Sequence, residues 1–467
     1  MGRLIVVSNR VSPPGDAAAG TVGGLAMAIS AALREYSGIW FGWSGQTRET
    51  FTGQLSIQQA DGVTVALVDL EEQDRQEYYN GYANRTLWPL FHYRTDLVAY
   101  ERSFSEGYAR VNSRFAETLA PLVQPDDFIW VQDYHLLPLA RQLRQRDIAN
   151  RIGFFLHIPW PARRLLTTLP RHAQLVEGLF DYDLIGFQTH DSRDAFADYI
   201  VQAAGGSVTE DGVATAFGKR TRIGAFPIGI DAESFASAAH SDAAMESFQR
   251  ARSSLLGRKM ILGVDRLDYS KGLDERFLAY EQFLVDHPDQ QEKVFLLQIA
   301  TPSRDEVEAY QDIRSRLESV SGRINGAFAD VDWVPIRYVN RGYRRDVLAG
   351  IYRAAHIGLV TPLRDGMNLV AKEYVAAQDP EDPGVLILSE LAGAAEQMGE
   401  ALIVNPFSRE EVAEAIRRGL EMPLEERKAR WAILSEGVNR DDVTAWRDSF
   451  VAALQREKPG QDADRPA

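Results

Sequence analysis

The chain has 467 residues, of which 45% are hydrophobic and 25% are charged, so its length suits two or three globular domains. Its net charge of −15 argues against a general nucleic-acid-binding protein, which needs a basic surface. The absence of cysteine excludes disulfides, thiolate metal sites and cysteine nucleophiles. The sequence has no apolar run of about 18 residues and no signal peptide, so we expect a cytoplasmic protein that does not bind membranes.

The first half of the chain alternates between predicted strands and predicted helices. Short apolar, β-branched runs indicate the strands, and a three-to-four-residue apolar repeat indicates the helices. The strands are expected at residues 3–8, 39–43, 63–70, 128–131, 152–157, 184–187 and 223–228. The helices are expected at residues 23–34, 74–80, 102–120, 136–144, 163–180 and 191–204.

A second alternation follows a linker-like stretch, residues 229–259. Its strands are expected at residues 260–264, 294–300, 333–339, 357–360, 385–388 and 401–404, and its helices at 274–284, 304–320, 343–355 and 369–377. We therefore predict an N-terminal domain at 1–235 and a C-terminal domain at 236–440. A last helix, about 440–456, is expected to pack back onto the first domain, and the polar residues 457–467 are expected to form a disordered tail.

Strands with continuous apolar character that alternate with helices predict parallel sheets covered on both faces. Two such alternations predict an α/β protein with two Rossmann-like, doubly wound domains. Ligands of such sheets bind at the carboxyl ends of the strands, which here predicts a site in a central cleft between the domains.

Polar side chains follow several of the predicted strands. They are Arg10, Asp133 and His157 in the first half and Arg266, Lys271, Arg304 and Asp365 in the second. Two cations that face a helix N-terminus would stabilise a diphosphate, in particular one that leaves during a reaction. The alternative for each arginine is a surface ion pair, and the alternative for His157 is a structural histidine.

Residues 361–374, TPLRDGMNLVAKEY, form the most informative stretch. A strand, a glycine turn and a helix start follow one another, and such a helix start offers backbone N–H groups to an anion. Asp365 and Glu373 would suit sugar hydroxyls better than phosphate, so we predict a nucleotide-sugar site. An ordinary strand-to-helix connection remains the alternative.

Several other motif matches do not indicate a binding site. Asp-x-Asp pairs at Asp181, Asp330 and Asp462 are expected by chance among 66 acidic residues. Residues 212–219 resemble a Walker loop but have the wrong spacing, and no Gly-x-Gly-x-x-Gly follows a strand. The eight histidines show no metal-ligand spacing, so neither a metal nor a cofactor is predicted.

Long and rare sequence strings extend from Val6 to Gln378. They are VVSNR, GGLA, WFGWSG, EYYNGYAN, LWPLFHYR, WVQDYHLLPLA, NRIGFFLHIPWP, DLIGFQT, PIGID, DRLDYSKGLDERFLAYE, RINGAF and TPLRDGMNLVAKEYVAAQ. Through these strings the chain closely resembles the trehalose-6-phosphate synthase family, the retaining glycosyltransferases of family 20 with the GT-B fold. The resemblance implies transfer of glucose from UDP-glucose to glucose 6-phosphate, giving α,α-trehalose 6-phosphate and UDP without a metal or cofactor.

The resemblance also implies the acceptor site and the reacting centre. Arg10, Tyr79 and Arg304 would hold the acceptor phosphate, and Trp40 and Trp88 would line the acceptor sugar. Asp133 would contact the acceptor and His157 the donor glucose near the reacting centre. The residues assigned to catalysis are Asp133, His157, Arg266, Lys271 and Asp365.

The donor site is implied in the same way. Gly23 and Gly24 would close over the donor, Arg266 and Lys271 would clamp the diphosphate, and Tyr343 would lie near the uracil. Asp365 would hold glucose hydroxyls and Glu373 the ribose. The motif residues between these two acids complete the predicted donor site: Gly366, Met367, Asn368, Leu369, Val370, Ala371 and Lys372.

The chain departs from the family pattern at two positions. Asp265 stands where Glu is common, and Gln132 where His is common; both changes look conservative. Three other functions remain as alternatives: a relative with another phosphorylated acceptor, a non-catalytic regulatory homologue and a sugar-binding transport protein. The sequence leaves open the preferred donor base, allosteric control and whether the chain forms a homo-oligomer such as a dimer or a tetramer.

Overall fold

The computed structural model describes residues 2–11, 29, 33, 38–60, 62–304 and 306–456. The chain forms two compact units. Unit 1 contains the described residues up to Pro227 and those from Trp446 onward, and unit 2 contains Ile228–Ala445. The sequence predicted that the chain passes from the first domain to the second near residue 235 and returns to the first near residue 440. The predicted tail at 457–467 lies outside the described residues.

Unit 1 is built on a ten-stranded sheet with the order β3-β4-β2-β1-β5-β6-β7-β10-β9-β8. The seven strands from β4 to β10 in this order run parallel, and β3, β9 and β8 add antiparallel pairs at the two ends. The strands are β1 (Leu4–Arg10), β2 (Ile39–Arg48), β3 (Leu55–Ala60), β4 (Val63–Glu71), β5 (Phe128–Gln132), β6 (Arg151–Phe155), β7 (Leu184–Phe187), β8 (Ser207–Val208), β9 (Val213–Ala216) and β10 (Lys219–Ala225).

One helix of unit 1 is of a wider type than the sequence predicted. A π-helix, η1 (Arg75–Leu87), occupies and extends the segment expected to be an α-helix at 74–80. The other helices are α2 (Glu72–Asp74), α3 (Trp88–Phe91), α4 (Arg102–Leu119), α5 (Leu139–Arg144), α6 (Arg163–Leu166), α7 (His172–Leu179), α8 (His190–Gln202) and the short turns η2 (Thr95–Leu97), η3 (Ala120–Leu122) and η4 (Tyr134–Leu136).

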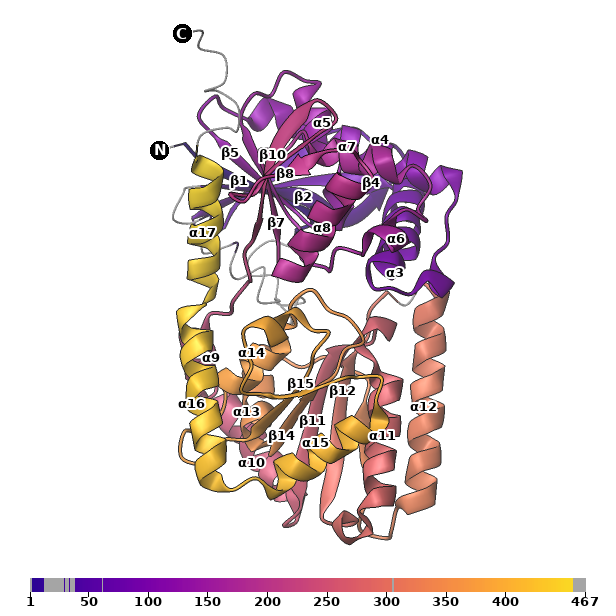
Figure 1. Ribbon diagram of the computed structural model, residues 1–467, viewed down its shortest axis with the longest axis vertical. Helices are drawn as coiled ribbons and strands as arrows, with labels where there is room; N and C mark the ends of the chain where they lie inside the picture. The colour runs from indigo at the N-terminus through magenta and orange to yellow at the C-terminus, as the bar shows by residue number, and fades with distance from the viewer. Residues whose placement is uncertain are drawn as a thin grey trace. The chain divides into compact units, whose positions relative to one another are not determined.

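The last helix, α17 (Val443–Gln455), packs the rings of Trp446 and Phe450 on residues of β5 and β6 in unit 1, and Figure 1 shows α17 as the last helix of the chain. Its Phe450 ring stacks on Trp130 of β5 at 4.6 Å between centroids. Gly153 of β6 and Gly186 of β7 leave room for the ring, because a Cβ on either glycine would lie 2.9 Å or 2.7 Å from it.

Unit 2 contains a fully parallel six-stranded sheet with the order β13-β12-β11-β14-β15-β16. The strands are β11 (Lys259–Arg266), β12 (Val294–Thr301), β13 (Ile336–Val339), β14 (Ile357–Val360), β15 (Val385–Ser389) and β16 (Leu402–Val404). The helices are α9 (Ala232–Ala238), α10 (Asp242–Leu255), α11 (Leu273–Asp286), α12 (Glu308–Phe328), α13 (Arg345–Ala354), α14 (Leu369–Ala376), α15 (Arg409–Glu421), α16 (Leu424–Arg440) and the turns η5 (Tyr269–Lys271), η6 (Pro288–Gln290) and η7 (Gly393–Glu396).

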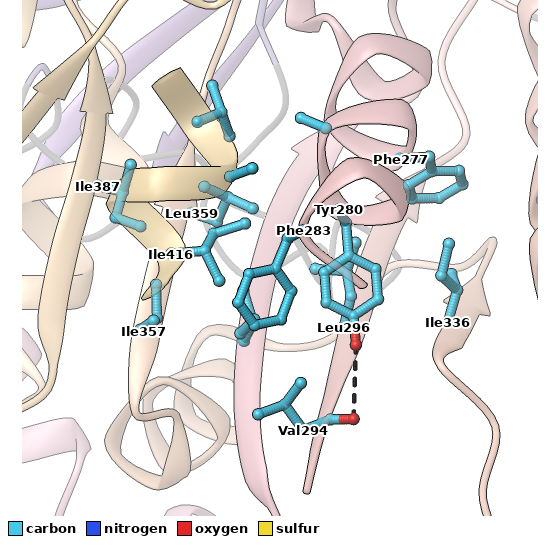
Figure 2. Packing of buried hydrophobic residues seen from close by; sticks show 14 of the residues in the cluster. Phe277, Tyr280, Phe283, Val294, Leu296, Ile336, Ile357, Leu359, Ile387 and Ile416 are labelled. Carbon is cyan, nitrogen blue, oxygen red and sulfur yellow. Dashed lines mark hydrogen bonds between the residues drawn. The ribbon is translucent and has the colours of Figure 1, made fainter. Parts of the chain in front are cut away.

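A hydrophobic core lies between the sheet of unit 2 and the helices α11, α12 and α15. Figure 2 shows Phe277, Tyr280 and Phe283 of α11 against the strand residues, with the Tyr280 hydroxyl 3.4 Å from the carbonyl oxygen of Val294. The parallel strands at the centre of one sheet and throughout the other confirm the predicted doubly wound α/β fold. No helix in the described part of the chain has both the length and the apolar character needed to cross a membrane.

The segments by which the chain enters and leaves unit 2 lie side by side. The Val443 N–H donates to the Ile230 carbonyl at 3.2 Å. Gly229 is so close to the backbone of Asp441 and Asp442 that no side chain would fit there. Both strand orders also reverse once, between β1 and β5 in unit 1 and between β11 and β14 in unit 2, and ligands of doubly wound sheets bind at such points.

Candidate active site

At the point in unit 2 where the strand order reverses, two of the predicted site residues come into contact. Lys271 follows β11 and Asp365 follows β14, and Lys271 Nζ donates to Asp365 Oδ2. Asn368 Nδ2 donates to the same carboxylate oxygen at 3.0 Å. Both side chains of the ion pair are largely buried, with exposed fractions of 10% and 15%. A cation and a carboxylate are therefore held together beside the start of α14.

The start of α14 is shaped by backbone hydrogen bonds. Asn368, the N-cap, has a left-handed backbone with φ 76°, and its side chain does not cap the helix. The loop before it is held by η7, since Ala394 N donates to Met367 O at 2.8 Å and Gly393 N donates to Asp365 O at 3.2 Å. The N–H groups of the first helical turn have no intrahelical partner, so this end of α14 can bind an anion.

Glu373 is enclosed further along the same helix. The Tyr352 hydroxyl lies 3.4 Å from Glu373 Oε2. Burial raises the pKa of Glu373 to about 7, although the charge of Arg345 and the Tyr352 hydrogen bond lower it. A carboxyl group with this pKa can be a donor or an acceptor towards a ligand hydroxyl near neutral pH.

The neighbouring Lys372 makes different contacts from those expected of a donor-site lysine. Its Nζ donates to the Ile228 carbonyl at 2.8 Å and to Gln397 Oε1 at 2.7 Å. Burial lowers the pKa of Lys372 to about 8. The side chain thus attaches α14 to the first residue of unit 2.

The remaining predicted residues of unit 2 have distinct surroundings. Arg266 ends β11 and is exposed, and Tyr343 is half-buried with its hydroxyl 2.9 Å from Arg341. Arg304 has a φ of 51°, and its guanidinium lies 3.5 Å from Asp268 Oδ2 and contacts the Tyr310 hydroxyl. Arg304, assigned by resemblance to the acceptor, therefore belongs to unit 2, whereas the other assigned acceptor residues belong to unit 1.

A buried charge pair beneath these residues was not predicted. Arg276 of α11 is fully buried and donates to Asp265 of β11, to Gln298 of β12 at 2.8 Å and to Thr361 after β14 at 3.0 Å. The pair thus fixes three strand ends in one place. In the sequence Asp265 stands out only as a replacement for Glu, and nothing in the pattern around Arg276 indicates a buried charge.

In unit 1 the predicted acceptor residues surround the end of β1. Arg10 lies over Gly45, which has a φ of 87°, and a Cβ there would lie 2.6 Å from Arg10 Nε. Trp40 is buried and its Nε1 donates to Ser8 Oγ at 3.1 Å. Tyr79 of η1 stacks on His135 at 5.9 Å.

Trp88 directly follows the π-helix and is 4% exposed. The centroid of its ring lies 4.1 Å from that of the His92 ring. Tyr78, also in η1, donates its hydroxyl to Asn9 Oδ1 at 2.8 Å, next to Arg10. The π-helix thus contacts the end of β1 through Tyr78, and its next residue, Tyr79, packs on Trp43 of β2 at 5.7 Å between ring centroids.

Asp133 and His157 meet at the ends of β5 and β6. Asp133 has an unusual backbone, with φ 73° and ψ 168°, and its Oδ1 accepts from the His157 N–H at 3.1 Å. The His157 ring lies between two amides: its Nε2 is 2.8 Å from Gln132 Oε1, and its Nδ1 is 3.2 Å from Gln188 Nε2. Burial lowers the pKa of His157 to about 3, so the imidazole is neutral.

Two of the predicted donor residues, Gly23 and Gly24, lie outside the described residues. Within the described part of the chain, no group of three or more His, Asp or Glu side chains is placed to hold a metal ion. Gln188 is the residue of this site that the sequence analysis passed over, although it lies in the quoted string DLIGFQT.

Comparison with known proteins gives a consistent result along the whole chain. The model of the family described as glycosyltransferase family 20 matches residues 8–456. A trehalose-6-phosphate synthase of Cronobacter sakazakii is 48% identical over 459 residues, which is 98% of this chain and 96% of the relative.

Two solved structures are similarly close. An alpha,alpha-trehalose-phosphate synthase (UDP-forming) from Burkholderia xenovorans in complex with glucose-6-phosphate is 49% identical, with a TM-score of 0.94 over 97% of this chain and 100% of that one. An E. coli structure described as bound with UDP-2-fluoro glucose is 47% identical, with a TM-score of 0.93 over 98% and 99% of the two chains.

Proposed function

Because the chain belongs to glycosyltransferase family 20, we propose that it transfers glucose from UDP-glucose to glucose 6-phosphate with retention of configuration. The products are α,α-trehalose 6-phosphate and UDP. Near-complete coverage by trehalose-6-phosphate synthases at about 48% identity supports this reaction, as do relatives whose structures contain glucose-6-phosphate and a UDP-glucose analogue.

We assign the donor to unit 2. The observation that carries this assignment is the convergence of Lys271 and Asn368 on Asp365 at the uncapped start of α14. Binding of UDP-glucose would give Lys271 a diphosphate partner and leave the Asp365 carboxylate for sugar hydroxyls. Arg266 adds a second cation at the end of β11, and Glu373 serves the ribose.

We assign the acceptor sugar to unit 1. Arg10 and Tyr79 are the phosphate ligands, and Trp40 and Trp88 border the hexose. Both tryptophans are at most 6% exposed, so only a small part of each ring can meet the sugar. The assignment of Arg304 to the acceptor phosphate rests on the resemblance alone.

In the proposed reaction the bond between glucose C1 and the β-phosphate oxygen breaks, and C1 bonds to the anomeric oxygen of glucose 6-phosphate. The acceptor hydroxyl proton passes to the leaving phosphate oxygen. Arg266, Lys271 and the N–H groups of α14 stabilise the charge that develops on the diphosphate. Asp133 and His157 orient the two sugars, and orientation of this kind lowers the barrier substantially.

An assay of UDP release with a panel of sugar phosphates and of nucleotide glucoses tests the proposal. We expect the highest kcat/KM with UDP-glucose and glucose 6-phosphate, and NMR of the product should show a 1,1-linkage with both anomeric centres α. Preference for another acceptor, or a β-linked product, would contradict it. The same panel identifies the preferred donor base.

A further inference from the structure

The two amides beside His157 determine which of its ring nitrogens bears hydrogen. Gln132 ends β5, His157 follows β6 and Gln188 follows β7, so three neighbouring parallel strands deliver these residues to one edge of the sheet. Gln132 and Gln188 are each 2% exposed. Burial of this extent holds both amides beside the imidazole and away from solvent.

Hydrogen bonding by amides has a fixed direction, since the oxygen only accepts and the nitrogen only donates. Gln132 Oε1 lies 2.8 Å from His157 Nε2, so Nε2 bears a hydrogen. Gln188 Nε2 lies 3.2 Å from His157 Nδ1, so Nδ1 presents its lone pair. The other neutral tautomer would oppose like groups at both contacts, and an imidazolium would oppose N–H groups at Gln188.

We propose that Gln132 is a positioning residue that, together with Gln188, holds His157 as the neutral tautomer with hydrogen on Nε2. The proposal rests on the proposed function, in which His157 orients the donor glucose. The carboxylate that contacts His157 does not disturb this arrangement, because Asp133 Oδ1 accepts from the backbone N–H of His157. The aromatic rings of Phe155 and Trp446, at 4.7 and 6.0 Å, enclose the imidazole.

The fixed tautomer has a consequence for the transfer. With its Nδ1 lone pair held by the Gln188 amide, the imidazole does not take the acceptor proton, and its Nε2–H remains a donor that a hydroxyl of the donor glucose can share with Gln132. The acceptor proton is thus left to the departing phosphate oxygen. The neutral ring also places no positive charge beside the oxocarbenium-like carbon, where a cation would raise the barrier.

The direct test is NMR of the full-length protein labelled with 15N-histidine, with the His157 signals assigned through a His157→Gln variant. We expect a protonated Nε2 and an unprotonated Nδ1, unchanged at a pH about one unit below the ordinary histidine pKa of ~6.5. Gln132→Leu should give a mixture of tautomers, whereas Gln132→Glu keeps the acceptor oxygen and should keep the tautomer. A wild-type pattern in Gln132→Leu would overturn the proposal.

Kinetics test whether the tautomer matters to the reaction. Gln132→Leu should lower kcat by about 10- to 100-fold with little change in either KM, by analogy with residues that orient metal-ligating histidines. The matched control is Gln174→Leu on α7, an exposed position that should leave both readouts unchanged. If Gln132→Leu does not fold, Gln188→Met tests the proposal by removing the hydrogen bond to His157 Nδ1.

The outcomes separate this inference from the proposed function. A changed tautomer with unchanged kcat would overturn the link between His157 and catalysis, while UDP release by the wild type would still stand. Failure of the wild type to release UDP from UDP-glucose would instead overturn the proposed function.

Discussion

The two units use one topology but place different chemistry at the strand ends. In unit 2 the groups after β11 and β14 are charged: Lys271 with Asp365, and Arg276 with Asp265 directly beneath. In unit 1 the side chains that contact the His157 ring are neutral, namely the Gln132 amide at the end of β5 and the Gln188 amide after β7, and the Asp133 carboxylate after β5 accepts from the His157 backbone N–H. The charged groups of unit 2 suit a diphosphate that gains negative charge on leaving, and the neutral groups around His157 suit a hexose whose hydroxyls need directed hydrogen bonds.

The largest effect is expected from removing the buried cation of unit 2. Arg276→Met should lower the free energy of unfolding by about 3–5 kcal/mol, because it leaves the Asp265 carboxylate buried and unpaired. Arg323→Met, which removes an exposed pair with Glu281, is the control and should cost less than about 1 kcal/mol. Denaturant unfolding measures both, and equal costs would contradict the assigned role of burial.

Loss of the charged groups that face the donor should reduce turnover. Arg266→Ala and Lys271→Ala should each lower kcat at least about 100-fold, the scale of one lost transition-state donor. Arg250→Ala, an exposed position on α10, should leave kcat unchanged. Near-wild-type kcat in both site variants would rule out the diphosphate clamp.

The pH dependence of stability sharpens the comparison, because Glu373 is an acid in the charged unit that burial keeps protonated. Its folded pKa, about 7, lies above the ordinary value of 4.5, so the native state binds the extra proton between these values. Stability should therefore fall as pH rises from 4.5 towards 7, by about 3 kcal/mol in total. The difference in unfolding free energy between Glu373→Gln and wild type should show this slope, and a flat difference would contradict it.

The smallest effect is expected from a neutral contact in unit 1. Ser8→Ala removes the acceptor of the Trp40 Nε1–H and should cost about 1 kcal/mol, the usual contribution of one such bond. Ser56→Ala, at an exposed position on β3, serves as the matched control. A loss of stability as large as that of Arg276→Met would mean that this neutral contact in unit 1 contributes as much to stability as the buried charge pair in unit 2.

The strand ends were predictable because an apolar run followed by an isolated polar residue needs no tertiary information. Lys271 and Asp365 were identified in this way, and the sheet order explains why they meet. Their ion pair was not predictable, because it joins residues far apart in the chain whose strands become neighbours only in the folded sheet.

Other features depended on packing that no local pattern records. The π-helix η1 was predicted as a shorter helix over 74–80, because the residues of a segment do not distinguish π-helical turns from α-helical ones. Lys372 lies in a motif that suggested the donor, but its position on α14 directs the side chain to Ile228 and Gln397. Gln132 looked like a conservative replacement, and its significance depends on the two ring nitrogens of His157.

The hydrogen bond between Val443 and Ile230 holds the two ends of unit 2 next to each other, so unit 2 could be produced as a separate protein. A segment whose two ends are adjacent can be closed by a short linker, opened elsewhere or exchanged as a cassette, because its ends already satisfy the geometry of a loop. New termini could be opened at the exposed turn around Val331, between α12 and β13. Such a permuted unit 2 would let nucleotide binding be measured by calorimetry in the absence of the other unit.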